Sequence, residues 1–120
     1  MAKELKFSAS HEWAELDGKT AVIGVTDYAA ELMGDIVFVE LPAVGSRIKA
    51  GATFANIESV KAVSEVFSPV TGIVTAVNLS LNDSPELINR DAFAAYLIKA
   101  DVEALEDGLM TESEYNKLKH

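Results

Sequence analysis

The segment Glu58-Ser59-Val60-Lys61-Ala62-Val63-Ser64 decides how the chain is interpreted, because it joins two stretches with strand character. Thr53–Ser59 alternates between two faces, as a half-buried strand does, and Val63–Phe67 is a second short strand candidate. One face of the first strand would carry Phe54, Asn56 and Glu58, and the other Ala55, Ile57 and Ser59. Only a few residues remain for the turn, so Lys61 is expected at or near the tip of a hairpin.

A lysine at a hairpin tip lies away from the core and is open to other proteins, so a modifying enzyme could reach its amine. An exposed lysine amine is protonated at neutral pH and must lose a proton before it attacks an activated acyl group. Amide formation would remove the charge and leave a long flexible tether. The alternative is that Lys61 is an ordinary solubilising residue, and its position alone favours that alternative.

The rest of the chain contains mainly short strands separated by turn residues. Asp17-Gly18 between two apolar runs predicts a β-hairpin whose turn residues tolerate positive φ. Pro69 and Gly72 are expected to interrupt the chain. Further strands are expected at 12–16, Thr20–Val25, 35–41, 73–77 and 96–99. Helices are expected at Asp27–Met33 between Thr26 and Gly34, as one turn from Ser84, at 101–106 ending at Gly108, and from a Thr111 capping box through Leu118.

The composition limits the possible functions. The chain has 120 residues, 49% hydrophobic and 24% charged, which is typical of one folded domain. It contains no cysteine, so disulfides and thiolate metal sites are excluded. A net charge of −9 argues against nucleic-acid binding, which needs Lys and Arg against phosphates. No apolar run is long enough to span a membrane, and residues 1–6 lack a secretory signal, so we expect a cytoplasmic protein.

The residues around Lys61 closely resemble the lipoylation motif of the glycine cleavage system H-protein family. Further segments resemble the same family in the same order, and together they cover the chain from about Phe7 onward. They are Ser10-His11-Glu12-Trp13, GVTDYA at 24–29, GDIVFVELP at 34–42, SPVTG at 68–72 and SPELIN at 84–89. Several motifs in order are far more specific than any one of them.

The resemblance implies a mainly β fold: a flattened β-barrel or sandwich of the biotinyl/lipoyl type with short helices, including a C-terminal helical segment. Residues 1–120 would form a single lipoyl-carrier domain. A weak repeat, 45–51 and 72–78, agrees with two similar halves on either side of Lys61. Lipoate would be joined to Lys61 as an amide, with a recognition motif formed by Glu58, Ser59, Val60 and Ala62.

The implied function is to carry an intermediate between enzymes. A glycine decarboxylase (P protein) would load the aminomethyl group of glycine onto the lipoyl arm, and an aminomethyltransferase (T protein) would move the carbon to tetrahydrofolate. Dihydrolipoamide dehydrogenase (L protein) would reoxidise the arm, and lipoylating enzymes would attach it. The chain itself would be a non-catalytic carrier, expected to be a monomer. A role as a lipoyl relay that supplies lipoyl groups to other proteins remains the alternative.

The resemblance also implies a cleft that holds the loaded arm, formed by Ser10, Glu12 and Glu65. A carboxylate there would shield a protonated amine through a charge-assisted hydrogen bond. The alternative for each residue is an ordinary exposed polar side chain, and Glu65 stands where the family commonly has aspartate. His11 receives no catalytic role, and Trp13 is expected to be a packing residue. Residues 90–96 depart from the family pattern, being about one residue short and lacking a glycine, with Tyr96 in a tryptophan position.

Other classes fit the sequence less well. Biotinyl domains usually flank their lysine with methionines, whereas Val60 and Ala62 flank Lys61. Lipoyl domains of 2-oxo acid dehydrogenases commonly have aspartate before the lysine and Pro/Ala-rich linkers, and neither is present. A hydrolase would need a nucleophile, a base and an orienting group together, which a chain with no cysteine and two histidines does not offer. An interaction module with an unmodified Lys61 remains open.

Overall fold

The hairpin that carries Lys61 is present as expected. A computed structural model describes residues 3–118, and in it β6 (Thr53–Ser59) pairs antiparallel with β7 (Val63–Phe67). The Ser59 amide donates to the Ala62 carbonyl at 2.8 Å, which leaves Val60 and Lys61 as the two turn residues. The alternating burial predicted for β6 is confirmed, with Ala55, Ile57 and Ser59 buried. The pairing of β6 with β7 on either side of Lys61 therefore involves residues close in sequence.

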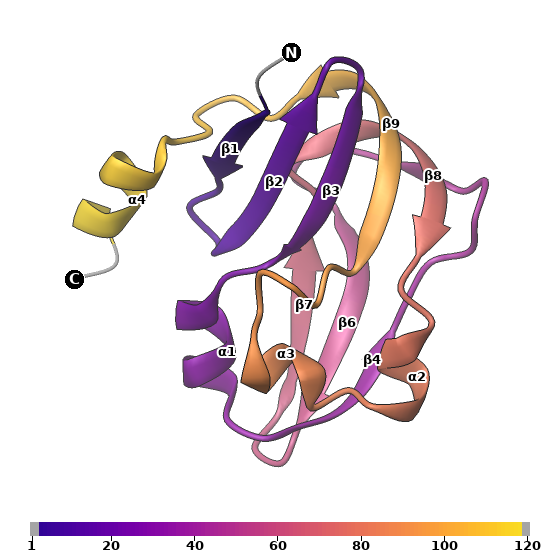
Figure 1. The fold of residues 1–120 in the computed structure, drawn as a ribbon, viewed down its shortest axis with the longest axis vertical. Helices are drawn as coiled ribbons and strands as arrows, with labels where there is room; N and C mark the ends of the chain where they lie inside the picture. The colour runs from indigo at the N-terminus through magenta and orange to yellow at the C-terminus, as the bar shows by residue number, and fades with distance from the viewer. Residues whose placement is uncertain (1–2, 119–120) are drawn as a thin grey trace.

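Among residues 3–118, two antiparallel sheets form the body of the molecule (Figure 1), and the prediction of a mainly β sandwich with short helices is confirmed. The three-stranded sheet has the order β4-β6-β7, with β4 at Ile36–Glu40. The six-stranded sheet has the order β1-β2-β3-β9-β8-β5. Its strands are β1 (Glu4–Phe7), β2 (Glu12–Asp17), β3 (Thr20–Val25), β9 (Ile98–Leu105), β8 (Val70–Val77) and β5 (Arg47–Ile48).

The main core lies between the sheets, because each contributes the buried face of its strands. Ile57 of β6, Val39 of β4, Ile23 of β3 and Ile98 of β9 are all at most 1% exposed. A smaller cluster of Phe7, Trp13 and Tyr115 joins the start of the chain to its C-terminal helix. The packing role predicted for Trp13 is confirmed.

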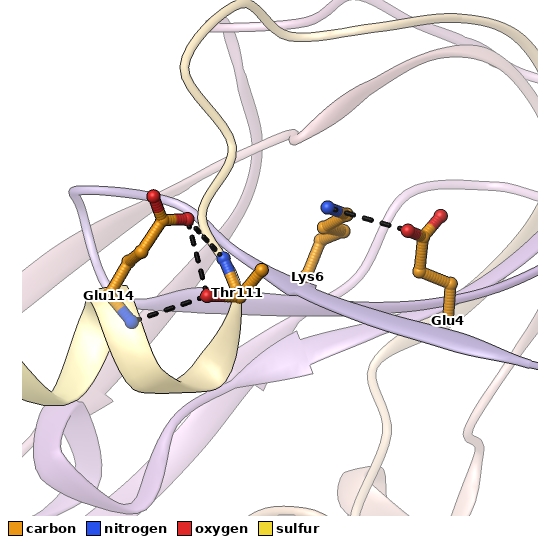
Figure 2. A network of polar contacts seen from close by, with 4 residues as sticks. All are labelled: Glu4, Lys6, Thr111 and Glu114. Carbon is orange, nitrogen blue, oxygen red and sulfur yellow. Dashed lines mark hydrogen bonds and ion pairs between the residues drawn. The ribbon is translucent and has the colours of Figure 1, made fainter.

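Within the described part of the chain, four short helices lie beside the sheets: α1 (Asp27–Met33), α2 (Ser80–Asp83), α3 (Leu87–Arg90) and α4 (Glu112–Leu118). The predicted ends of α1 are confirmed, since Thr26 Oγ1 accepts from the Ala29 amide and Gly34 follows with φ +77°. The capping box at α4 is confirmed as well. Thr111 N donates to Glu114 Oε1 at 2.9 Å, and Glu114 N donates back to Thr111 Oγ1 (Figure 2).

The helix expected at 101–106 is wrong, because these residues continue β9 as far as Leu105. Their Ala, Leu and Glu favour a helix locally, but β9 lies between β3 and β8 and pairs with both. Ladder pairing with β8 and the packing of half-buried Val102 against the core decide the conformation there. The late strand expected at 96–99 accordingly begins later, at Ile98.

The break expected at Gly72 is also wrong, because β8 begins at Val70 and runs through it. The register shifts between Thr71 and Gly72, and a Cβ on Gly72 would lie 1.8 Å from the Asp101 carbonyl oxygen. Glycine is therefore needed for the close approach of two strands and does not end one.

Two turn predictions need smaller corrections. The β2–β3 turn is Gly18-Lys19, with Asp17 paired to Thr20, and of Asp17, Gly18 and Lys19 only Gly18 has positive φ. A turn does begin at Ser84, whose carbonyl accepts from the Leu87 amide, but the helix α3 itself begins at Leu87 and Ser84 is not its N-cap. The α2 helix was not predicted.

Candidate functional site

Lys61 lies at the exposed tip of the β6–β7 hairpin, which extends past α1 and α3 at the bottom of Figure 1. Its neighbours Val60 and Val63 are 68% and 63% exposed, although both are apolar. Glu58 is exposed as well and pairs with Val63 across the hairpin. The hairpin tip thus exposes a lysine amine, two valine side chains and a carboxylate, and another protein can contact this surface.

Ser59 of the recognition motif determines the shape of this turn. Its Oγ accepts hydrogen bonds from the amides of Lys61 and Ala62, both at 3.3 Å, and donates to the Ala62 carbonyl at 3.2 Å. One buried hydroxyl thus satisfies three backbone groups of a tight loop. The predicted recognition residues Glu58 to Ala62 are therefore brought together, with Ser59 inward and Lys61 outward.

The lysine side chain is not free in solvent but rests on the end of α1. Lys61 Nζ donates to the Leu32 carbonyl at 3.2 Å, and a Cβ added at Gly34 would lie 3.1 Å from Lys61 Cε. The Val60 amide donates to the Asp35 carbonyl at 3.0 Å. The sequence did not predict these contacts, since nothing in the pattern of residues 32–35 indicates that a distant hairpin tip lies on them.

Two of the three residues predicted for the arm cleft lie together. Ser10 Oγ and Ser8 Oγ both donate to Glu12 Oε1, and the Phe67 amide donates to Glu12 Oε2 at 3.1 Å. Glu12 is only 2% exposed, and this burial raises the pKa of its carboxyl, while the three donors act in the opposite direction. The carboxylate thus links the β1–β2 connection to the end of β7.

Glu65, the third predicted cleft residue, is exposed on β7. Its Oε1 accepts from Thr53 Oγ1 at 2.9 Å, and within residues 3–118 no hydrogen bond joins it to Ser10 or Glu12. The grouping of Glu65 with the other two residues stays a prediction. His11 has φ +73°, and its Nδ1 lies 2.8 Å from the Tyr115 hydroxyl, which agrees with a structural position.

Two other features that would bear on function are a group of side chains that could hold a metal ion and a helix that could span a membrane. Residues 3–118 contain no group of three or more His, Asp or Glu side chains placed to hold a metal ion. Across the same residues, none of the helices has the length and apolar character required to cross a bilayer.

Comparison with known proteins identifies the family. The model of the glycine cleavage H-protein family matches residues 5–120. The chain belongs to this family. Proteins of the glycine cleavage H-protein family are the lipoyl carriers of the glycine cleavage system.

Individual proteins of the family are similar to this chain over most of its length. The glycine cleavage system H protein of Acidobacterium capsulatum is 52% identical over 97 residues, covering 81% of this chain and 75% of that protein. The H protein of Carboxydothermus hydrogenoformans is 45% identical over 119 residues, covering 97% and 92%. The crystal structure of a glycine cleavage system H protein from Mycobacterium marinum has a TM-score of 0.89 at 33% identity, covering 98% and 97%. The family resemblance seen in the sequence is confirmed.

Proposed function

We propose that this chain carries lipoate as an amide on Lys61 Nζ and acts as a single lipoyl-carrier domain of the glycine cleavage system. It would hold the aminomethyl group of glycine between the P protein and the T protein, with the L protein restoring the disulfide of the arm. The exposed amine of Lys61 at a two-residue hairpin turn, inside the Glu58–Ala62 motif of an H-protein family member, carries this proposal.

The residues around Lys61 fit such an amide. Its hydrogen bond to the Leu32 carbonyl uses only one of the hydrogens on Nζ, and Val60 and Val63 project outward beside it. The deprotonated amine would attack an activated lipoyl carboxyl, forming the C–N bond as the activating group leaves and Nζ releases a proton. When attached, lipoate supplies the two sulfurs that a chain without cysteine lacks.

The part played by the protein is positioning. Ser59 holds the turn so that Lys61 points away from the core, and the tether keeps its cargo at a high effective concentration near each successive active site. Exposed Val60 and Val63 offer apolar contacts to the partner enzymes and to the lipoylating enzymes. In this proposal the chain performs no catalysis, and it works in the cytoplasm with its partner enzymes.

A resting place for the loaded arm at Ser10 and Glu12 belongs to the same proposal. Glu12 offers a buried carboxylate, and Ser10 is exposed beside it. A protonated amine would compete with the Ser10 hydroxyl for Glu12 Oε1. Glu65 would contribute to this resting place only if its side chain broke its hydrogen bond with Thr53 Oγ1.

The decisive experiment is intact-mass measurement of protein exposed to a lipoylating enzyme, lipoate and ATP. Lys61→Arg is the test variant, and Lys19→Arg is its matched control because Lys19 also lies in an exposed two-residue hairpin turn. We expect a lipoyl-sized mass increment in the wild type and in Lys19→Arg but not in Lys61→Arg. An increment that persists in Lys61→Arg would contradict the assignment of the site.

The glycine role has its own test. Glycine-dependent exchange of carbon dioxide with a P protein should require the lipoylated form of the chain. Equal rates with the unmodified protein, or with Lys61→Ala, would refute the role in glycine cleavage even if Lys61 is lipoylated, and would leave the relay function in its place.

A further inference from the structure

The side chain of Asn89 on α3 is bonded to the segment that connects α1 with β4. Asn89 Nδ2 donates to the Gly34 carbonyl at 2.8 Å, and Asn89 Oδ1 accepts from the Ile36 amide at 3.0 Å. The nitrogen and the oxygen of the Asn89 side chain are thus each hydrogen-bonded to a backbone group, and these two backbone groups lie on either side of Asp35. An amide used in this bidentate way fixes the orientation of the peptide segment it spans.

The same segment supports the hairpin tip. The Asp35 carbonyl accepts from the Val60 amide, and Gly34 faces Lys61 Cε so closely that a Cβ would lie 3.1 Å from it. The Leu32 carbonyl, which accepts from Lys61 Nζ, is one of the last carbonyls of α1. Such carbonyls lack a partner within their helix, and a lysine amine is a suitable donor for them.

We propose that Asn89 is a positioning residue for Lys61: by holding Gly34 and Ile36, it maintains a seat on which the lysine side chain is presented for lipoylation. This inference rests on the proposed function. Asn89 does not touch Lys61 and acts through Gly34 and Asp35. An acylated Nζ keeps one hydrogen, so the bond to the Leu32 carbonyl can persist in the modified protein and orient the root of the arm.

The variant Asn89→Ala removes both side-chain bonds, and Asn89→Asp keeps the acceptor for Ile36 but removes the donor to Gly34. Asn78→Ala is the matched control, because Asn78 also bridges two backbone groups, the Tyr96 carbonyl and the Ser80 amide, in another part of the molecule. The control therefore loses equivalent bonds without affecting the seat.

The first measurement is NMR of the unmodified protein. We expect a nuclear Overhauser contact between Gly34 Hα and Lys61 Hε in the wild type and in Asn78→Ala, and its loss in Asn89→Ala. Amide exchange at Val60 should be about fivefold faster in Asn89→Ala, since two partly exposed hydrogen bonds together contribute about 1 kcal/mol. An unchanged contact and exchange rate in Asn89→Ala, or equal changes in Asn78→Ala, would overturn the inference.

The second measurement is the kinetics of lipoylation with each variant as the acceptor. If the seat is populated less often, KM for the acceptor rises, by at most about fivefold for a change of about 1 kcal/mol, while kcat is retained, because the apparent affinity falls with the competent fraction. Asn89→Asp should raise KM as well, because a carboxylate oxygen would replace the donor that faces the Gly34 carbonyl. Loss of the Gly34–Lys61 contact with unchanged KM would overturn the functional part. Failure of the wild type to be lipoylated would refute the proposed function, while the NMR result would still decide whether the seat exists.

Discussion

Among the described residues, Glu12 is the most deeply buried one with a charged side chain. Removing its carboxylate tests how much this group contributes to the stability of the fold. Glu12→Ala leaves Ser8 Oγ, Ser10 Oγ and the Phe67 amide without their acceptor. The Ser10 hydroxyl is exposed and can turn to water, whereas the other two donors lie in or near the core. The variant also leaves a small cavity, since Glu12 is 2% exposed.

The expected magnitude follows from these contacts. A hydrogen bond to a charged group is worth about 1.5–3 kcal/mol, but removal of a buried charge returns part of this free energy as relieved desolvation. We expect Glu12→Ala to lower the free energy of unfolding by about 3 kcal/mol. For a chain of 120 residues, an unfolding entropy of about 0.25 kcal/mol/K converts this loss into a Tm decrease of about 12 °C.

Glu12→Gln separates the charge from the hydrogen bonds. Its amide oxygen can accept from the Phe67 amide while its NH₂ group donates to Ser10, so we expect a loss of about 1 kcal/mol or less at neutral pH. Glu15→Ala, on the same strand, removes only a surface ion pair with Lys3 at 3.8 Å and should change Tm by less than about 2 °C. Scanning calorimetry of the three variants gives all the values.

The dependence on pH gives a second readout. Because burial raises the pKa of Glu12 in the folded protein above its ordinary value of 4.5, the folded state binds more protons than the unfolded state just above that pH. The contribution of Glu12 to stability therefore falls as pH rises from about 4.5 to the folded pKa, and Glu12→Gln lacks this slope. Equal Tm values for Glu12→Ala and Glu12→Gln, or an opposite slope, would refute the reasoning.

Three further predictions concern the stability of the fold. Gly72→Ala places a Cβ 1.8 Å from the Asp101 carbonyl oxygen, so we expect a loss of more than about 4 kcal/mol in urea unfolding, or no folded protein in circular dichroism. Thr26→Ala removes the cap of α1 and should lower stability by about 1–2 kcal/mol, with Thr26→Ser near the wild type in the same assay. Arg47→Ala removes an exposed bidentate pair with Glu103, and its effect on Tm should be below about 4 °C and disappear in 1 M salt.

The parts of the fold that the sequence predicted correctly depend on residues close together in the chain. The β6–β7 hairpin, the Thr26 cap and the Thr111 capping box each involve groups only a few residues apart. The errors occur where distant strands determine the conformation. Residues 101–106 have a helical composition but pair with β3 and β8, and Gly72 resembles a break until the Asp101 carbonyl is placed against it.

The candidate site also has features that local sequence predicts and features that only the folded structure explains. Lys61 and the residues of its motif are contiguous, and the Ser59 hydroxyl bonds to their turn, so a local pattern is sufficient to find them. The direction in which the lysine is presented depends on Gly34 and on Asn89, whose mutual contact spans 55 residues. The SPELIN segment showed a family resemblance, but its composition gives no reason for an asparagine at its end. Only the folded structure supplies that reason, because it bonds the Asn89 amide to the Gly34 carbonyl and the Ile36 amide, in the segment that lies against the hairpin tip. A carrier is therefore specified by two separable requirements, a turn that exposes the amine and a distant support that orients it, and substitutions at Asn89 can change the second without changing the first.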